Sequence, residues 1–330
     1  MEQFKLITEA RDKIAEKWQK RGLQAAPEKS TKKKIIGLSM GRKNGNCETL
    51  LHAAALGAEE FGIDVEIIRA IELRIKPCVG CGSCTMALAR GKIAECSIKD
   101  DDVPWILEKT VLEDNGLILA VPVYHLRNSG AFMVIAERLH PTMFSHLEIL
   151  KKNKVGGIIS VGGSDWTPFG LSGANIWMLH HRRIVDQVQF NFGIRDKAPM
   201  ERARELGRNV ARSMSMPIEE VNFTGDRTAV ECPVCHCNIL QVDQDLPQVV
   251  CPVCFVHGVI SVDNGKMKIS WKEEEVKKHR FSEYGVFEHL DLIIHNLNQV
   301  PSRQEIVKKL HKEYTSHATY LKPSSNKHTI

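Results

Sequence analysis

Residues 34–51 read KIIGLSMGRKNGNCETLL, and this stretch decides the fold. Residues 35–38 form an apolar run short enough for a buried strand, and residues 49–61 have the apolar periodicity of a helix. A polar loop containing glycines joins them, and extended character resumes at residues 65–68. A strand, a loop, a helix and a second strand in this order predict the start of a parallel sheet.

The same alternation continues along the chain. Further apolar runs at residues 116–121, 155–161 and 184–190 alternate with helical segments near residues 103–112, 131–139 and 200–214. The pattern predicts an α/β fold, with a flavodoxin-like, doubly wound, five-stranded parallel sheet over residues 34–216. The ligand site of such a sheet lies beyond the carboxyl ends of its strands.

A helical arm is expected before this domain. Phe4, Ile7, Ile14 and Trp18 share one helical face, so residues 1–33 are assigned to an N-terminal arm and linker. The arm either packs against its own domain or exchanges between protomers.

Two further segments are expected after the domain. Residues 217–275 combine short β runs with paired cysteines, which predicts a small β module of the zinc-ribbon kind. The Asn264-Gly265 pair predicts a hairpin within it. Residues 276–330 form a helical C-terminal extension, with helices at residues 283–300 and 304–314 and a frayed tail.

The composition is that of an ordinary globular protein. The 330 residues are 43% hydrophobic and 26% charged, and the formal charge of +5 comes from local lysine runs, so nucleic acid is not an expected partner. No stretch has the length and apolarity of a signal peptide or a membrane span, so a cytoplasmic location without membrane contact is expected. The ten cysteines fall mostly into CxxC pairs, which favours metal or redox sites over disulfides.

The loop after the first strand suits an anion. Backbone N–H groups and the positive end of the following helix face such a ligand, and Arg42, Asn44, Asn46 and Thr49 add donors. The loop fits neither GxGxxG nor the GxxxxGK fingerprint, and a plain strand–helix connection remains the alternative.

In its surroundings, the loop resembles the GSPRxxGNT loop of the NADPH-dependent FMN reductase superfamily, which holds the flavin phosphate. The match lies at Arg42, Gly45 and Asn46. The departures from the family pattern are Ser39, Met40, Gly41 and Cys47. Cys47 is either a reactive thiol with a pKa lowered by the helix start or a buried substitute for threonine.

The resemblance extends to Pro122-Val123-Tyr124, to Glu137-Arg138 and to the Gly162-Gly163 loop, while Leu126 stands where the family has glycine. It implies that Tyr124 and His125 position and tune the flavin. His125 is either a proton donor or an ordinary loop histidine. The cofactor-binding residues implied for FMN are Ser39, Gly41, Arg42, Asn44, Asn46, Cys47, Thr49, Pro122, Val123, Tyr124, His125, Asn128, Ser129, Gly162, Gly163 and Asp165.

A first cysteine motif follows the second strand. Cys78, Cys81, Cys84 and Cys96 resemble the compact motif of the iron-sulfur flavoproteins in this superfamily, which holds a [4Fe-4S] cluster. Gly80 and Gly82 allow the backbone to wrap closely. A zinc knot or free thiols are the alternatives. Three aspartates at residues 100–102, followed by Pro104, indicate a helix start after the motif.

A second set of cysteines lies in the C-terminal module. Cys232, Cys235, Cys251 and Cys254 form two CPVC pairs, a zinc-ribbon or rubredoxin-like signature in which four thiolates surround one ion. Few aromatic residues surround the pairs, which favours zinc over rubredoxin-type iron. Cys237 is the fifth cysteine, either a spare or a redox-sensitive neighbour of the four.

These features together predict an FMN-dependent oxidoreductase. FMN would receive electrons from NAD(P)H or a ferredoxin, and the cluster would pass them to a small-molecule or protein acceptor. The alternatives are a non-enzymatic electron carrier whose ribbon docks a protein partner, and a ribbon-based regulator that has lost FMN. The resemblance also implies a homodimer or homotetramer.

Overall fold

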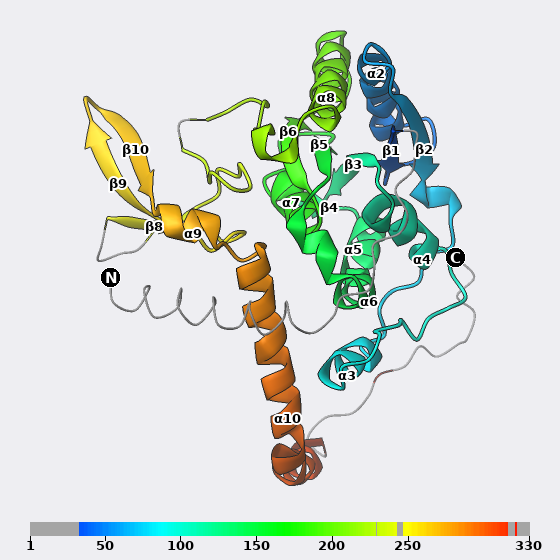
Figure 1. Cartoon of the computed structure of the whole chain (residues 1–330), viewed down its shortest axis with the longest axis vertical. Helices are drawn as coiled ribbons and strands as arrows, with labels where there is room; N and C mark the ends of the chain where they lie inside the picture. Colours follow the sequence, from blue (N-terminus) through cyan, green and yellow to red (C-terminus); the bar gives the residue numbers. More distant parts are fainter. Residues whose placement is uncertain (1–32, 229, 243–246, 316–320, 322–330) are drawn as a thin grey trace.

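The computed structural model describes residues 33–228, 230–242, 247–315 and 321, and its core is a parallel sheet (Figure 1). The strand order is β2-β1-β3-β5-β6, and β4 pairs antiparallel with β3. The five-stranded parallel sheet expected from the sequence is therefore confirmed. The strands are β1 (Lys34–Ser39), β2 (Asp64–Arg69), β3 (Gly116–Tyr124), β4 (Arg127–Asn128), β5 (Val155–Val161) and β6 (Arg183–Phe190).

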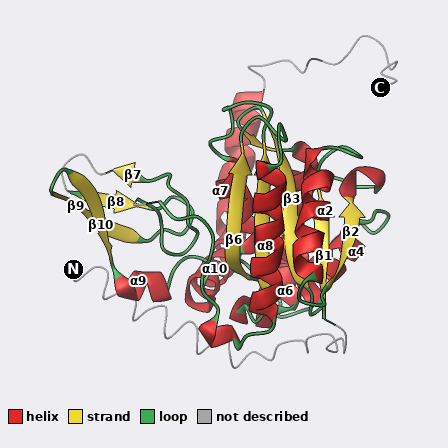
Figure 2. Ribbon diagram, turned by 90° about the horizontal axis from the view of Figure 1, so that it is seen from above, coloured by secondary structure: helices red, strands yellow, loops and turns green. Residues whose placement is uncertain are grey.

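Helices cover both faces of this sheet (Figure 2). On one face, α2 (Asn46–Glu59) and α8 (Ala198–Met214) pack over residues such as Ile35 and Ile159. The other face, with Ile36 and Leu119, belongs to a second core. Alternate residues along each strand enter different cores, as the pleat requires. The helices on this second face are α4 (Val103–Leu107), α5 (Gly130–Glu137), α6 (Leu139–Ser145) and α7 (Gly170–Met178).

The α7 helix was missed in the sequence. It begins Gly-Leu-Ser-Gly, and the glycines and serine conceal the helical period. Its buried residues Ala174, Trp177 and Met178 pack in the second core, so tertiary contacts stabilise the helix despite its weak local propensity.

The C-terminal module is a four-stranded antiparallel sheet of order β10-β9-β8-β7. Its turn at Asn264 and Gly265 has φ values of 50° and 73°, so the expected hairpin is confirmed. The module lies beyond the β6 edge of the large sheet (Figures 1 and 2). The strands are β7 (Gln241–Val242), β8 (Gln248–Val250), β9 (His257–Asp263) and β10 (Lys266–Trp271), followed by α9 (Glu273–Lys277).

The C-terminal extension is one helix, α10 (Glu283–Tyr314), rather than the two helices expected from Pro301. Proline removes one backbone N–H and crowds the preceding turn, which bends a helix without always ending it. The first turns bury Val286, Phe287 and Leu290 in the second core. The expected N-terminal arm and the final tail lie outside the described residues.

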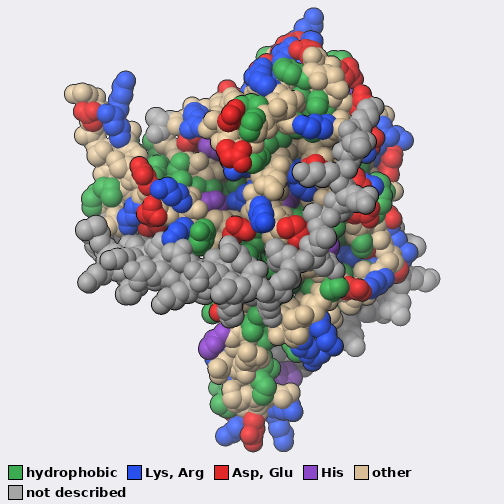
Figure 3. Space-filling model, viewed as in Figure 1, with side chains coloured by type: hydrophobic (Ala, Val, Ile, Leu, Met, Phe, Trp, Pro, Cys, Tyr) green, Lys and Arg blue, Asp and Glu red, His purple; other side chains and the backbone are tan. Residues whose placement is uncertain are grey.

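The charged surface is mixed on the face that Figure 3 shows, where Lys and Arg side chains alternate with Asp and Glu. The formal charge of +5 therefore forms no single basic surface on that face. Among the described residues, the chain contains no helix with the length and apolar character needed to cross a membrane.

Candidate flavin pocket and cysteine sites

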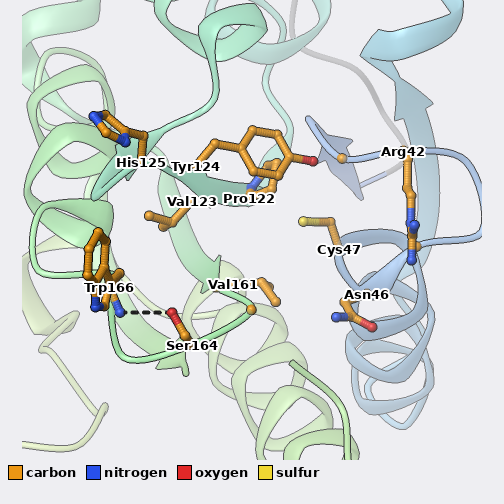
Figure 4. Close-up of a pocket in the computed structure, with 14 residues that line it drawn as sticks. Arg42, Asn46, Cys47, Pro122, Val123, Tyr124, His125, Val161, Ser164 and Trp166 are labelled. Carbon is orange, nitrogen blue, oxygen red and sulfur yellow. Dashed lines mark hydrogen bonds between the residues drawn. The ribbon is translucent and has the colours of Figure 1, made fainter. Parts of the chain in front are cut away.

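A cavity of about 540 Å³ opens beyond the carboxyl ends of β1, β3 and β5, where the doubly wound fold predicts a ligand (Figure 4). Its size lies within the range of cofactor sites. Three loops that are distant in sequence meet here. The lining residues are Gly41, Arg42, Gly45, Asn46, Cys47, Pro122, Val123, Tyr124, His125, Val161, Gly162, Gly163, Ser164 and Trp166.

One end of the cavity is built to receive an anion. The α2 helix starts at Asn46, and its N-cap residue Gly45 provides no side-chain cap, so the first backbone N–H groups are available to a ligand. Arg42 and Asn46 lie at this end (Figure 4). Arg42 is exposed and forms no ion pair with another described residue. These donors fit the phosphate of FMN.

A buried carboxylate holds this loop in shape. Glu48 is 3% exposed; one carboxylate oxygen accepts the Asn44 N–H at 2.8 Å, and the other accepts Arg69 Nε at 2.9 Å. The hydrogen bond from Arg69 is the main cause of the lowered pKa of Glu48. The sequence analysis missed this residue. The only signal was an acidic residue in the first turn of a helix, which many helices have.

Cys47 points its sulfur into the cavity (Figure 4). The side chain is buried, and burial raises the pKa of its thiol to about 12. The thiol is therefore protonated at neutral pH, and the reactive, low-pKa alternative is wrong. Cys47 instead acts as a small, buried side chain in the wall of the cavity.

The other end of the cavity is aromatic. Trp166 and His125 lie on the side away from Arg42, and Tyr124 lies between the two sides with its hydroxyl directed toward the Arg42 loop (Figure 4). A two-residue turn follows β3, and its residues His125 and Leu126 have φ values of 51° and 74°. Glycine or asparagine normally occupies such positions, which explains why glycine is usual at position 126 in the family. Strained backbone of this kind is concentrated at ligand sites.

Several predicted cofactor residues lie outside the cavity lining. Asn44 and Thr49 shape the loop, since Thr49 Oγ1 donates to the Gly45 carbonyl at 3.0 Å. Asn128 is buried and donates to the Gly170 carbonyl at 2.7 Å. Ser39 and Ser129 are buried, and the exposed Asp165 lies between two lining residues.

The first cysteine motif starts from the same edge of the sheet, because it follows β2, which runs parallel to β1. Gly80 and Gly82 have φ values of 64° and 70°, as the tight loop requires. Cys81 Sγ lies 3.1 Å from Ser97 Oγ, so the loop meets the segment that carries Cys96. Hydrogen bonding with Ser83 and then with Ser97 lowers the pKa of Cys81 to about 7.

The cysteines of this motif are more exposed and more dispersed than those of the C-terminal module. Cys84 lies on α3 (Ser83–Ala89), while Cys78 and Cys81 are exposed. In the described part of the chain, the four sulfur atoms of this motif do not gather around one point as those of the C-terminal module do. A [4Fe-4S] cluster takes one thiolate per iron, so its thiolates need not surround a single atom.

Arg138 joins the two arms of the cysteine motif. It is 3% exposed and donates to the carbonyls of Lys76 and Ile98, both at 3.2 Å, and to the carboxylate of Asp101. Asp101 in turn accepts the Lys76 N–H at 2.9 Å. The aspartates expected at the start of α4 therefore also hold the chain that enters the motif.

The second cysteine set forms a compact centre. The sulfur atoms of Cys232, Cys235, Cys251 and Cys254 lie within 4.8 Å of one another, and all four side chains are fully buried. Cys235 Sγ and Cys251 Sγ are 3.6 Å apart. A tetrahedral ion with bonds of about 2.3 Å to sulfur places its ligands about 3.8 Å apart, so the set fits one zinc or iron ion.

The two knuckles of this centre have the same backbone geometry. The N–H groups of His236 and Phe255 donate to the carbonyls of Cys232 and Cys251, and both residues have positive φ. Asn175 of α7 donates to the Cys235 carbonyl at 2.8 Å and contacts Cys237 Sγ at 3.0 Å. Cys237 is therefore a docking contact outside the group of four.

Comparison with known proteins agrees with this geometry. A family model described as NADPH-dependent FMN reductase matches residues 34–192. An iron-sulfur flavoprotein of Methanosarcina thermophila is 31% identical over 163 residues, which cover 48% of this chain and 80% of the relative. The chain belongs to the iron-sulfur flavoprotein family. A second iron-sulfur flavoprotein, from Methanocaldococcus jannaschii, is 36% identical over 132 residues, which cover 40% of this chain and 63% of the relative.

The solved structure of a flavone reductase has the same fold over 88% of this chain and 99% of its own length, with a TM-score of 0.70 and 24% identity. This likeness extends past the part that the FMN reductase model matches. As a member of the iron-sulfur flavoprotein family, the chain is a flavoprotein of the oxidoreductase class.

Proposed function

We propose that the chain holds FMN in the cavity at the carboxyl edge of the sheet and acts as an oxidoreductase that takes electrons from NAD(P)H or a ferredoxin. The observation that carries this proposal is the polarity of the cavity, with open helix N–H groups and Arg42 at one end, Trp166 at the other and the Tyr124 ring between them. Bound FMN supplies hydride acceptance and single-electron transfer.

The residues of the anion end bind and orient. Arg42 and Asn46 would meet the phosphate together with the first N–H groups of α2, whose partial positive charge favours an anion. Glu48 keeps the loop in place through the Asn44 N–H. Ser39 and Ser129 each have a buried hydroxyl without a partner among the described residues.

The residues of the aromatic end would control access to the ring. Tyr124 and Trp166 are 59% and 64% exposed, so they present flat surfaces to a planar acceptor and exclude water once covered. His125 lies on the strained turn beside them and is the proposed proton donor. Gly163 leaves open space where a side chain would stand.

Cys78, Cys81, Cys84 and Cys96 are the proposed ligands of a [4Fe-4S] cluster, which supplies single-electron transfer. Arg138 would keep their two segments together, because it binds carbonyls before Cys78 and after Cys96. The C-terminal set would hold zinc, which stabilises the module, or iron, which adds a further electron carrier.

Three further assignments belong to this proposal. The acceptor is a small molecule or a redox protein, and the chain functions as a homodimer or homotetramer. Its compartment is the cytoplasm, since all ten cysteines, every one within the described residues, are free of disulfides. The second candidate function is an electron carrier that is reduced only by a protein. The docked ribbon module favours this function, because the module offers a surface for such a partner.

Anaerobic reconstitution with FMN tests the proposal. We expect one FMN per chain, bleached rapidly by NADPH, and at least tenfold weaker FMN binding in Arg42→Gln. Lys43→Gln is the matched control, because Lys43 is the next residue in the same loop but pairs with Glu72 and does not line the cavity. Reduction by ferredoxin but not by NADPH would support the carrier. Failure of the wild type to retain FMN would refute both.

The same preparation tests the cluster. Cys81→Ser should abolish the broad visible absorbance of a [4Fe-4S] centre and leave FMN binding intact. Cys47→Ser, in the flavin cavity, should keep that absorbance. Unchanged absorbance in Cys81→Ser would remove this residue from the ligand set.

A further inference from the structure

A second cavity, of about 370 Å³, lies between the large sheet and the first cysteine knuckle. Its walls come from the segments that enter β5 and β6, and from residues that precede and follow Cys232. The flavin cavity opens at the carboxyl end of β5, so the two sites are separated by the length of this strand, roughly 20 Å.

The second cavity is lined by cations. No aspartate or glutamate is among its described lining residues. None of the exposed or half-buried cations forms an ion pair with another described residue. The cationic lining residues are Lys151, Lys152, Arg182, Arg183 and Arg227.

Arg182 is the most deeply buried of these cations. Its side chain is fully buried, and its guanidinium donates only to the neutral carbonyls of Thr110, Asn115 and Val155. Its Nε has no hydrogen-bond partner among the described residues. Burial lowers the pKa of Arg182 to about 9, and the charge of Asp114 opposes this shift. Since its guanidinium is held by these carbonyls, Arg182 adds positive potential behind the cavity wall, and the more accessible cations are left to contact a ligand.

The metal centre supplies only part of the negative charge that would balance these cations. Four thiolates around a divalent ion carry a net charge of about −2. The Cys254 thiolate does favour the charged form of Lys152. The four more accessible cations, Lys151, Lys152, Arg183 and Arg227, therefore still exceed the charge of the metal centre, and Arg183 and Arg227 line the cavity from opposite modules.

We propose that this second cavity binds a small molecule bearing phosphate groups, with at least two negative charges, between the large domain and the ribbon module. Arginine is suited to this ligand because its planar fork pairs with two oxygens of one phosphate. Lysines on the sheet side and Arg227 on the ribbon side would share the ligand. Binding would therefore stabilise the docking of the two modules.

Calorimetric titration of the full chain, loaded with metal and saturated with FMN, tests the proposal. Saturation with FMN keeps the anions away from Arg42. Inorganic pyrophosphate and ADP, in phosphate-free buffer, form the two arms. We expect one saturable site per chain in at least one arm; tighter binding of ADP would indicate a nucleotide, and tighter binding of pyrophosphate an inorganic polyphosphate.

The double variant Arg183→Gln/Arg227→Gln should weaken this binding at least tenfold. Arg303→Gln is the control, because Arg303 is exposed on α10 and does not line the cavity. Metal and FMN contents should stay unchanged in both variants. Absence of saturable binding in both arms would overturn the proposal, as would full affinity in the double variant or an equal loss in Arg303→Gln.

Discussion

At the scale of single residues, Gly193 supports the anion end of the flavin cavity from a distant part of the chain. It has a φ of 67°, and a Cβ there would lie 2.3 Å from Asn46 Nδ2. We expect Gly193→Ala to displace Asn46 and to weaken FMN binding at least tenfold in a fluorescence titration.

Gly62→Ala provides the control for this prediction. Gly62 has a φ of 69°, but a Cβ there would meet nothing within 4 Å. In both variants, alanine at a positive φ lowers the folding stability by about 1 kcal/mol. Only Gly193→Ala also changes a contact at the flavin cavity. Equal FMN affinity in the two variants would contradict a binding role for Asn46.

Glu48 makes the stability of the loop dependent on pH. Its pKa is lowered below the ordinary value of 4.5, so the ionised form stabilises the fold above that pH, and the contribution is lost as the pH falls toward the lowered pKa. We expect Glu48→Gln to lower the free energy of unfolding by about 2 kcal/mol at pH 7. The difference from the wild type should shrink below pH 4.5 in urea unfolding.

Glu66→Gln is the matched control for pH. Glu66 pairs with Lys34 at 2.8 Å, but its side chain is 62% exposed, and exposed pairs contribute about 0–1 kcal/mol. A Glu48→Gln variant that matched Glu66→Gln at every pH would show that the buried carboxylate does not hold the loop.

Residues that belong to a motif could be identified from the sequence more readily than residues that hold the motif in place. Arg42, Asn46 and Tyr124 could be assigned to the cavity because loop and turn patterns are local, and the structure places all three in its lining. The supporting roles of Glu48 and Arg138 could not be assigned, since their ionic partners Arg69 and Asp101 lie more than 20 positions away. Such contacts depend on how the strands are ordered in the sheet.

At the scale of elements, the four gathered cysteines of the two knuckles are predicted to behave differently from the nearby Cys237. We expect Cys254→Ser to lose the bound ion, because it removes one of the four gathered thiols. Cys237→Ser should keep one ion per chain, since Cys237 is equally buried but lies outside that group. Metal analysis after gel filtration measures both, and loss of the ion in Cys237→Ser would mean that the fifth cysteine is a ligand.

Element prediction failed at Pro301, where the local signal indicates a break but α10 continues. Residues 301–314 are exposed, so the backbone hydrogen bonds of the flanking turns, and not packing, outweigh the loss of one N–H. The hairpin at Asn264-Gly265 was predictable, since its turn depends on two residues alone.

At the scale of the whole molecule, Asn175 is one of the side chains that link the two modules. Asn175 is fully buried in α7 and donates to the Cys235 carbonyl. We expect Asn175→Ala to leave that carbonyl unpaired, to lower stability by about 1–3 kcal/mol, and to speed removal of the ion by a chelator. Asn222→Ala, at an exposed position, should change neither rate nor stability.

The parallel sheet could be predicted from the chain alone because the alternation of strands and helices is a periodic signal, and the family could be predicted because the Arg42 loop and the first cysteine motif resemble known motifs. The docking of the ribbon module could not. It depends on Asn175 and on Gln187, which donates to the His236 carbonyl at 2.9 Å, and neither residue belongs to a motif. Unchanged chelator sensitivity in Asn175→Ala would show that the modules are held mainly by their apolar contacts.

The complete burial of the four C-terminal thiols has a consequence for how the mature protein acquires its ion. A thiol shielded from solvent on every side exchanges its metal only when the surrounding backbone opens. We therefore expect ion exchange in the folded module to be slow, so that the ion bound during folding is the one that the protein retains.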